Sequence, residues 1–360
     1  MRLSLKSIVL AGSLLIPGLL NYADAGDNSS RTETTKHDAR QTLEPIYEIQ
    51  AGLDGEIYPV FANYASLQKL NARSFGVVAV AVSNPGDLPL RQRISVRIPG
   101  WSDQEIQIAE VAAHSAHTFL FAPAFLPRFY RNREITAATA QIAVSDLAGH
   151  SVYESTAPVR LRSAEDMYWG ADFKYAPFVA SWVTPHDARV ESVLARAKRY
   201  TTDRRLPGYE NWKNAAQQEQ ETYHEAEAIY LAVKNLGMSY VRSSTTLGDH
   251  TSASERIRMP GVSLSHSSAN CIDAAVMYAS LFENLGMDST VLIVPGHAYA
   301  GVRVAAGSPK FLYIDVALTG RSTFAQAVAS AETGLARYDV RAVTRVAIRE
   351  ARSSGIFPMP

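Results

Sequence analysis

The chain has 360 residues, 35 Lys+Arg against 35 Asp+Glu, and a formal net charge of zero. This balance disfavours nucleic acid and anionic membranes as partners. The length predicts two domains, each able to bury a core of its own. The single cysteine, Cys271, excludes an intramolecular disulfide and a cysteine-rich metal site.

The first 25 residues have the pattern of a secretory signal peptide. Arg2 and Lys6 precede an apolar run over residues 8–20, and Ala23-Asp24-Ala25 supplies small residues for cleavage. The run is shorter than the ~20 residues that span a bilayer, so cleavage is favoured over a retained anchor. We therefore expect an exported protein, periplasmic or extracellular, with no stable membrane insertion after cleavage.

Residues 26–44 are polar and predict a flexible tether. Short β-type runs with turn residues between them follow over residues 45–163. In one run, Ile94, Val96 and Ile98 alternate with polar residues, as in a half-buried strand. The pattern predicts an all-β immunoglobulin-like sandwich domain. The expected strands are 56–61, 75–82, 91–98, 105–111, 117–121, 137–144 and 151–161.

Residues 164–185 are rich in aromatic side chains and predict a connector that packs as a seam between two domains. Helical periodicity begins after Thr184 and again over residues 215–236. Strand patterns return after residue 285. We expect residues 186–360 to form an α+β domain of the catalytic type.

Cys271 precedes an apolar run with helical spacing that ends at Gly286. At a helix start, free N–H groups and the helix dipole favour a thiolate. His297 begins a strand after Pro295-Gly296, and Asp315 closes the next strand. Adjacent antiparallel strands place these two side chains next to each other. A nucleophile, a base and a residue that orients the base form a catalytic triad.

These residues resemble the transglutaminase-like superfamily of cysteine enzymes, over about residues 180–355. The resemblance implies a papain-like or transglutaminase-like core, in which the helix bearing the cysteine packs on an antiparallel sheet. It also implies that Cys271, His297 and Asp315 are catalytic. The chain has Ala269-Asn270 where many members have glycine before the cysteine. The matching motifs are Asn270-Cys271-Ile272-Asp273, Gly296-His297-Ala298 and Tyr313-Ile314-Asp315.

The predicted enzyme is a cysteine protease, amidase or acyltransferase that forms an acyl-enzyme on a peptide or protein substrate. His297 would take the proton of Cys271, and Asp315 would orient the imidazole. The backbone N–H of Cys271 would donate to the oxyanion. Water as acceptor makes a hydrolase, which we favour; an amine makes a transglutaminase.

Several alternatives stay open. His266 is a rival base, although its serine-rich surroundings are typical of a solvated loop. Asn270, Tyr299 and Trp182 are weaker candidates for oxyanion or substrate binding, with buried packing as the alternative. The sequence shows no pattern of metal ligands. It also shows no cofactor motif, and this disfavours an acetyltransferase with a thioester cofactor. The other class of function is a non-catalytic peptide-binding or scaffold protein of the cell envelope, which would bind a protein partner through the sandwich.

Overall fold

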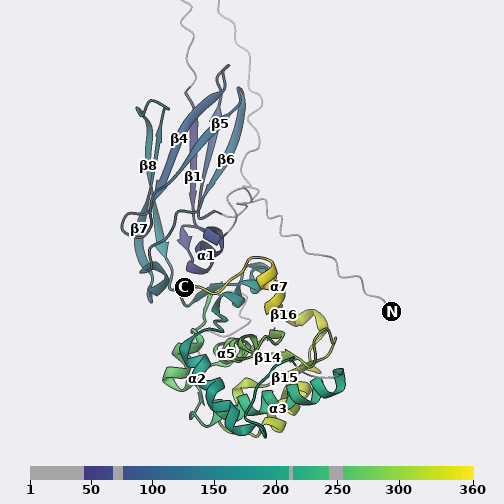
Figure 1. Ribbon diagram of the computed structural model, residues 1–360. Helices are drawn as coiled ribbons and strands as arrows, with labels where there is room; N and C mark the ends of the chain where they lie inside the picture. The colour runs from purple at the N-terminus through teal and green to yellow at the C-terminus, as the bar shows by residue number, and fades with distance from the viewer. Residues whose placement is uncertain (1–43, 68–75, 211–213, 243–253) are drawn as a thin grey trace, which may run out of the picture.

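The computed structural model describes residues 44–67, 76–210, 214–242 and 254–360. The predicted signal peptide and residues 26–43 of the predicted tether lie outside the described residues. The protein mixes helices and strands, as expected for an α+β chain. Figure 1 shows the strands of residues 46–161 at one end of the molecule and the helices that surround a second sheet at the other.

Two sheets form the N-terminal part of the described chain. A five-stranded sheet has the order β2-β8-β7-β4-β5, and a three-stranded sheet has the order β1-β3-β6. Buried side chains of both sheets, such as Val80, Ile94 and Ile142, share one apolar core. The strands are β1 (Ile46–Ala51), β2 (Glu56–Ile57), β3 (Val78–Asn84), β4 (Leu90–Arg97), β5 (Glu105–Val111), β6 (Ser115–Phe121), β7 (Thr136–Ser145) and β8 (Ser151–Leu161).

The predicted strand over residues 56–61 is wrong, so this part of the chain is not all-β. Only β2 is extended, and α1 (Pro59–Leu67) follows it. Proline is well suited to the first helical turn, where its missing N–H is not needed. The run 56–61 suggested a strand, but α1 buries side chains around much of its surface, which removes the one-sided pattern of a surface helix.

A four-stranded antiparallel sheet, in the order β15-β14-β13-β16, forms the centre of the C-terminal part. On one face, Val291, Ile293 and Ala300 share a core with α5 (Cys271–Asn284). On the other face, Leu292 and Tyr299 pack with Ala331 of α6 (Phe324–Leu335). The strands are β13 (Ser289–Val294), β14 (His297–Arg303), β15 (Phe311–Ile314) and β16 (Thr344–Ala347).

The helices predicted after residue 184 are confirmed. Asp187 accepts a hydrogen bond at the start of α2 (Ala188–Ala197), and Asn214 does the same for α3 (Ala215–Lys234). Short pieces complete this part: β9 (Asp166–Tyr168) pairs with β11 (Ser254–Arg256), and β10 (Ser239–Tyr240) pairs with β12 (Ser268–Ala269). The remaining helices of the described ranges are α4 (Pro260–His266), α7 (Ile348–Ser353) and the 3-10 helices η2 (Phe129–Arg131), η3 (Ala171–Phe173), η4 (Ala176–Trp182), η5 (Lys198–Tyr200), η6 (Val316–Leu318) and η7 (Val340–Ala342).

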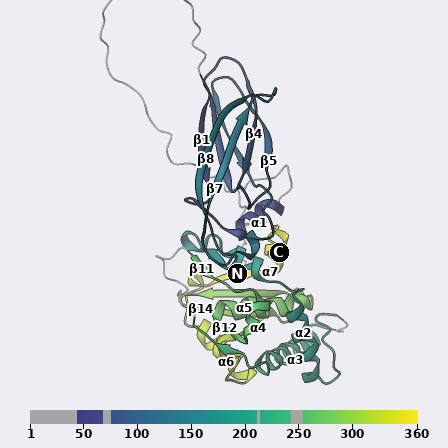
Figure 2. The ribbon, with the colours of Figure 1, turned by 90° about the vertical axis from the view of Figure 1, so that its left-hand side faces the viewer.

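The two parts meet at α1, which lies beside the C-terminal segment in both views (Figures 1 and 2). Tyr58, Val60 and Phe61 are buried in the core that also contains α5. Asn63 Nδ2 donates to the carbonyl of Pro358 at 3.3 Å. The N-terminal part thus contributes side chains to the core of the C-terminal part.

Arg352 of α7 connects several segments of the C-terminal part through hydrogen bonds. Its guanidinium donates to both carboxylate oxygens of Glu283, at 2.9 and 3.0 Å. It also donates to the carbonyls of Ala180, Val183 and Ile356. The far end of α5 is therefore tied to η4 and to the chain after α7.

Among the helices of the described ranges, none combines the length and the apolar character that a bilayer span requires.

Candidate active site

Cys271 is the first residue of α5, as predicted. Its side chain faces the buried core, and the residue is 7% exposed. The apolar residues that follow it, from Ile272 to Phe282, are buried, which fixes the helix against β13 and β14. The thiol therefore lies at the positive end of the helix dipole, a setting that favours negative charge.

The hairpin of β14 and β15 brings His297 and Asp315 together. Ala300 pairs with Ile314, so His297 at the start of β14 lies near Asp315, which directly follows β15. His297 Nε2 donates to Asp315 Oδ1 at 3.0 Å. Ser330 of α6 donates to the other carboxylate oxygen at 2.8 Å. The structure thus shows the predicted pair and adds Ser330, which no sequence pattern indicated.

The environment of His297 favours its charged form. Burial opposes that charge, but the hydrogen bond to Asp315 and the influence of the nearby Cys271 outweigh it and raise the pKa of His297 to about 9. Because Nε2 is bonded to Asp315, Nδ1 is the ring nitrogen left for Cys271. The imidazole is therefore bonded to Asp315, and its pKa also responds to Cys271.

Asp315 is held in the ionised form. Burial disfavours its charge, yet the hydrogen bonds from His297 and Ser330 keep the pKa of Asp315 below its ordinary value. The residue is 9% exposed. A buried acid of this kind needs a partner, and the structure shows that His297 is that partner.

Tyr299 packs against the imidazole instead of lining an open groove. The rings of His297 and Tyr299 meet edge to face, with centroids 4.6 Å apart and planes at 86°. Tyr299 is 4% exposed, and burial, followed by the charge of Asp315, raises its pKa to about 12. Its phenol therefore stays neutral and restricts rotation of the histidine ring.

The surroundings of Asn270 and Trp182, the other two weak candidates for oxyanion or substrate binding, indicate structural roles. Asn270 caps α5: its Oδ1 accepts the N–H of Asp273 at 2.8 Å, and Asp273 accepts the N–H of Asn270. Trp182 is fully buried in the core, and its indole N–H has no hydrogen-bond partner among the described residues. His266 lies at the exposed end of α4.

Tyr240 is a neighbour of the thiol that sequence reasoning did not select. The parallel pairing of β10 with β12 sets Tyr240 opposite Ala269, close to Cys271 in the chain. Tyr240 is 50% exposed; burial and the charges of Cys271 and Asp315 raise its pKa. No local pattern reveals this position, because it depends on pairing between distant segments.

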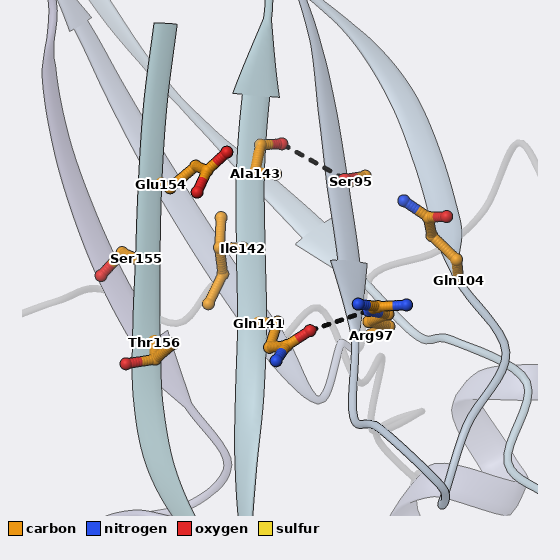
Figure 3. A pocket seen from close by; sticks show the side chains of 9 residues that line it. All are labelled: Ser95, Arg97, Gln104, Gln141, Ile142, Ala143, Glu154, Ser155 and Thr156. Carbon is orange, nitrogen blue, oxygen red and sulfur yellow. Dashed lines mark hydrogen bonds between the residues drawn. The ribbon is translucent and has the colours of Figure 1, made fainter. Parts of the chain in front are cut away.

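A separate hollow lies on the outer face of the five-stranded sheet, far along the chain from the triad. Its cavity volume is about 560 Å³. Figure 3 shows polar side chains of β4, β7 and β8 around it, with Arg97 Nε donating to Gln141 Oε1 at 2.8 Å. Neither Cys271, His297 nor Asp315 lines it. It is therefore not the site of the predicted chemistry.

No group of three or more His, Cys, Asp or Glu side chains in the described part of the chain could hold a metal ion. No protein-family model matches the chain, and no curated protein matches it either.

Proposed function

We propose that this chain is an exported, cysteine-dependent enzyme that cleaves peptide or carboxamide bonds through an acyl-enzyme on Cys271. The observation that carries the proposal is the imidazole of His297, which is hydrogen-bonded to Asp315 and has its pKa raised by both Asp315 and Cys271, with Cys271 at the N-terminus of a buried helix. The order of α5, β14 and β15 supports a transglutaminase-like core. The two sheets of residues 46–161 support an immunoglobulin-like sandwich.

In the first half-reaction, Nδ1 of His297 removes the thiol proton, and the sulfur attacks the carbonyl carbon. A pKa of about 9 lets the imidazole keep that proton near neutral pH. The backbone N–H of Cys271 donates to the oxyanion of the tetrahedral intermediate. When the C–N bond breaks, the imidazolium gives its proton to the leaving amine, and the thioester remains.

In the second half-reaction, His297 removes a proton from water, and the hydroxide attacks the thioester carbonyl. The C–S bond breaks, the sulfur leaves with the proton from the imidazolium, and a carboxylic acid is released. An amine in place of water gives transamidation with the same balance of atoms. Water is always present, and the resemblance favours hydrolysis.

The test compares the mature chain with Cys271→Ala, His297→Ala and Asp315→Asn. Iodoacetamide labels the thiol, and peptide and glutamine amides serve as substrates. We expect fast alkylation that slows in His297→Ala, and turnover that falls by about 10²–10⁴-fold without the histidine. His266→Ala, at the rival histidine, is the matched control and should behave as the wild type.

The scaffold alternative is favoured by one observation, the 7% exposure of Cys271. It predicts that Cys271 reacts no faster than free cysteine and that the His297→Ala variant reacts at the same rate. That result would contradict the enzymatic proposal.

A further inference from the structure

Asp273, in the first turn of α5, is a buried carboxylate with several donors. It is 1% exposed. Arg258 donates to it twice, through its backbone N–H to Oδ1 and through Nε to Oδ2, both at 2.8 Å. The backbone N–H of Asn270 donates to Oδ2 at 3.4 Å. A buried charge is stable only when it is paired and hydrogen-bonded in this way.

These hydrogen bonds connect the residues that precede and follow Cys271 in the chain. Cys271 stands between Asn270 and Asp273, whose side chains and backbone bond to each other. Arg258 also donates from Nη1 to Ser268 Oγ of β12 at 3.4 Å, so it holds the chain both before and after the cysteine. Within the described part of the chain, Arg258 bonds to Asp273 and Ser268 and not to Cys271 itself.

The segment that carries Arg258 is anchored on its other side. The N–H of Ile257 donates to the carbonyl of Glu165 at 2.7 Å, and β11 pairs with β9. Arg256 Nη2 donates to the carbonyl of Arg133 at 2.6 Å. Arg258 is therefore a fixed support, since neighbouring backbone is bonded to residues that lie outside the helix.

We infer that Arg258 is a positioning residue, which acts through Asp273 to keep the Cys271 sulfur directed at His297. The inference rests on the proposed function. Displacement of a reacting group by about 1 Å can slow a reaction about 10²-fold. When the guanidinium is lost, the Asp273 carboxylate moves toward water. The helical turn that carries the thiol then loosens.

The experiment measures alkylation of Cys271 and turnover in Arg258→Ala, Arg258→Lys and Asp273→Asn. Arg258→Ala should slow alkylation at neutral pH by about 10- to 100-fold and lower kcat more than it raises KM. Guanidinium ion added to Arg258→Ala should restore part of the rate. Arg258→Lys should give an intermediate rate, because one ammonium keeps the charge but not the paired geometry.

Arg352→Lys is the matched control, because Arg352 pairs with Glu283 at the opposite end of the same helix. It should lower stability but leave the alkylation rate of the folded protein within about twofold of wild type. Near-ultraviolet circular dichroism checks folding, and Arg258→Lys serves if Arg258→Ala does not fold.

The two proposals fail in different ways. Alkylation that is unchanged in His297→Ala contradicts the proposed function. Alkylation that slows in His297→Ala but stays at the control rate in Arg258→Ala and Arg258→Lys, with no guanidinium effect, contradicts the positioning role.

Discussion

His297 is the residue whose charge depends most on its neighbours in the site. In the proposed mechanism its imidazolium protonates the leaving amine, so turnover should fall as pH rises through about 9, the pKa of His297. Asp315→Asn removes a carboxylate that helps to raise this pKa. The alkaline limb of the pH profile of kcat should therefore move down, toward the ordinary histidine value of about 6.5.

Ser330→Ala is the control for that shift, because the serine bonds to Asp315 and not to His297. This variant keeps the carboxylate, so its alkaline limb should stay near that of the wild type and should not follow the limb of Asp315→Asn. An unchanged limb in Asp315→Asn would show that the carboxylate does not set the charge of the imidazole.

Glu255 of β11 provides a second pH test, this time of stability. Burial, and then the charge of Asp273, raise the pKa of Glu255 from 4.5 to about 8. The folded chain keeps a proton that the unfolded chain has lost, so this residue makes stability fall as pH rises from about 4.5 to 8. Glu255→Gln should flatten that fall in urea titrations between pH 5 and 8.

Glu154→Gln on β8 is the control for Glu255→Gln, because it makes the same substitution at an exposed carboxylate. Its stability should depend on pH as that of the wild type does. An equal pH slope in the wild type and in Glu255→Gln would mean that Glu255 is ionised in the folded protein at neutral pH.

At the level of elements, β14 carries the histidine and lies between β13 and β15. Gly301 sits where a Cβ atom would lie 2.6 Å from Thr290 Cγ2 and 2.7 Å from Tyr313 Cδ1. Gly301→Ala should therefore destabilise the protein by about 1–3 kcal/mol through overpacking. Thermal unfolding measures it, and an unchanged melting temperature would mean that the sheet relaxes freely.

The elements that could be predicted are those with a clear period. The apolar residues of α5 gave the helix and the position of Cys271, and an acid in an apolar strand indicated a partner for Asp315. The helix α1 was missed because its burial has no one-sided period. The roles of the Tyr240 and Arg258 side chains were not predicted, since they depend on pairing with Ala269 and Asp273, which only the folded chain brings near.

For the whole molecule, the shared core at α1 predicts coupled unfolding. Phe61 is 3% exposed, and its ring meets that of Phe178 edge to face at 4.9 Å. Phe61→Ala should lower the free energy of unfolding by about 3–5 kcal/mol. Since Phe61 packs in the core that contains Cys271, the temperature at which the thiol becomes fully reactive should fall with it.

Val152→Ala, at an exposed position of β8, is the control and should change neither quantity. Calorimetry that shows two transitions, with the temperature of thiol exposure unaffected by Phe61→Ala, would mean that the two parts unfold independently.

The bonds of Arg352 also bear on when the site is completed during synthesis. The far end of the helix that begins with Cys271 is tied to η4 and to Ile356 through this one guanidinium. The sheets of residues 46–161 can pair as soon as they emerge, but α5 gains its last anchor only when the chain has been made beyond Ile356. A chain that has been made only as far as Asp315 therefore carries Cys271, His297 and Asp315 before the far end of their supporting helix is anchored.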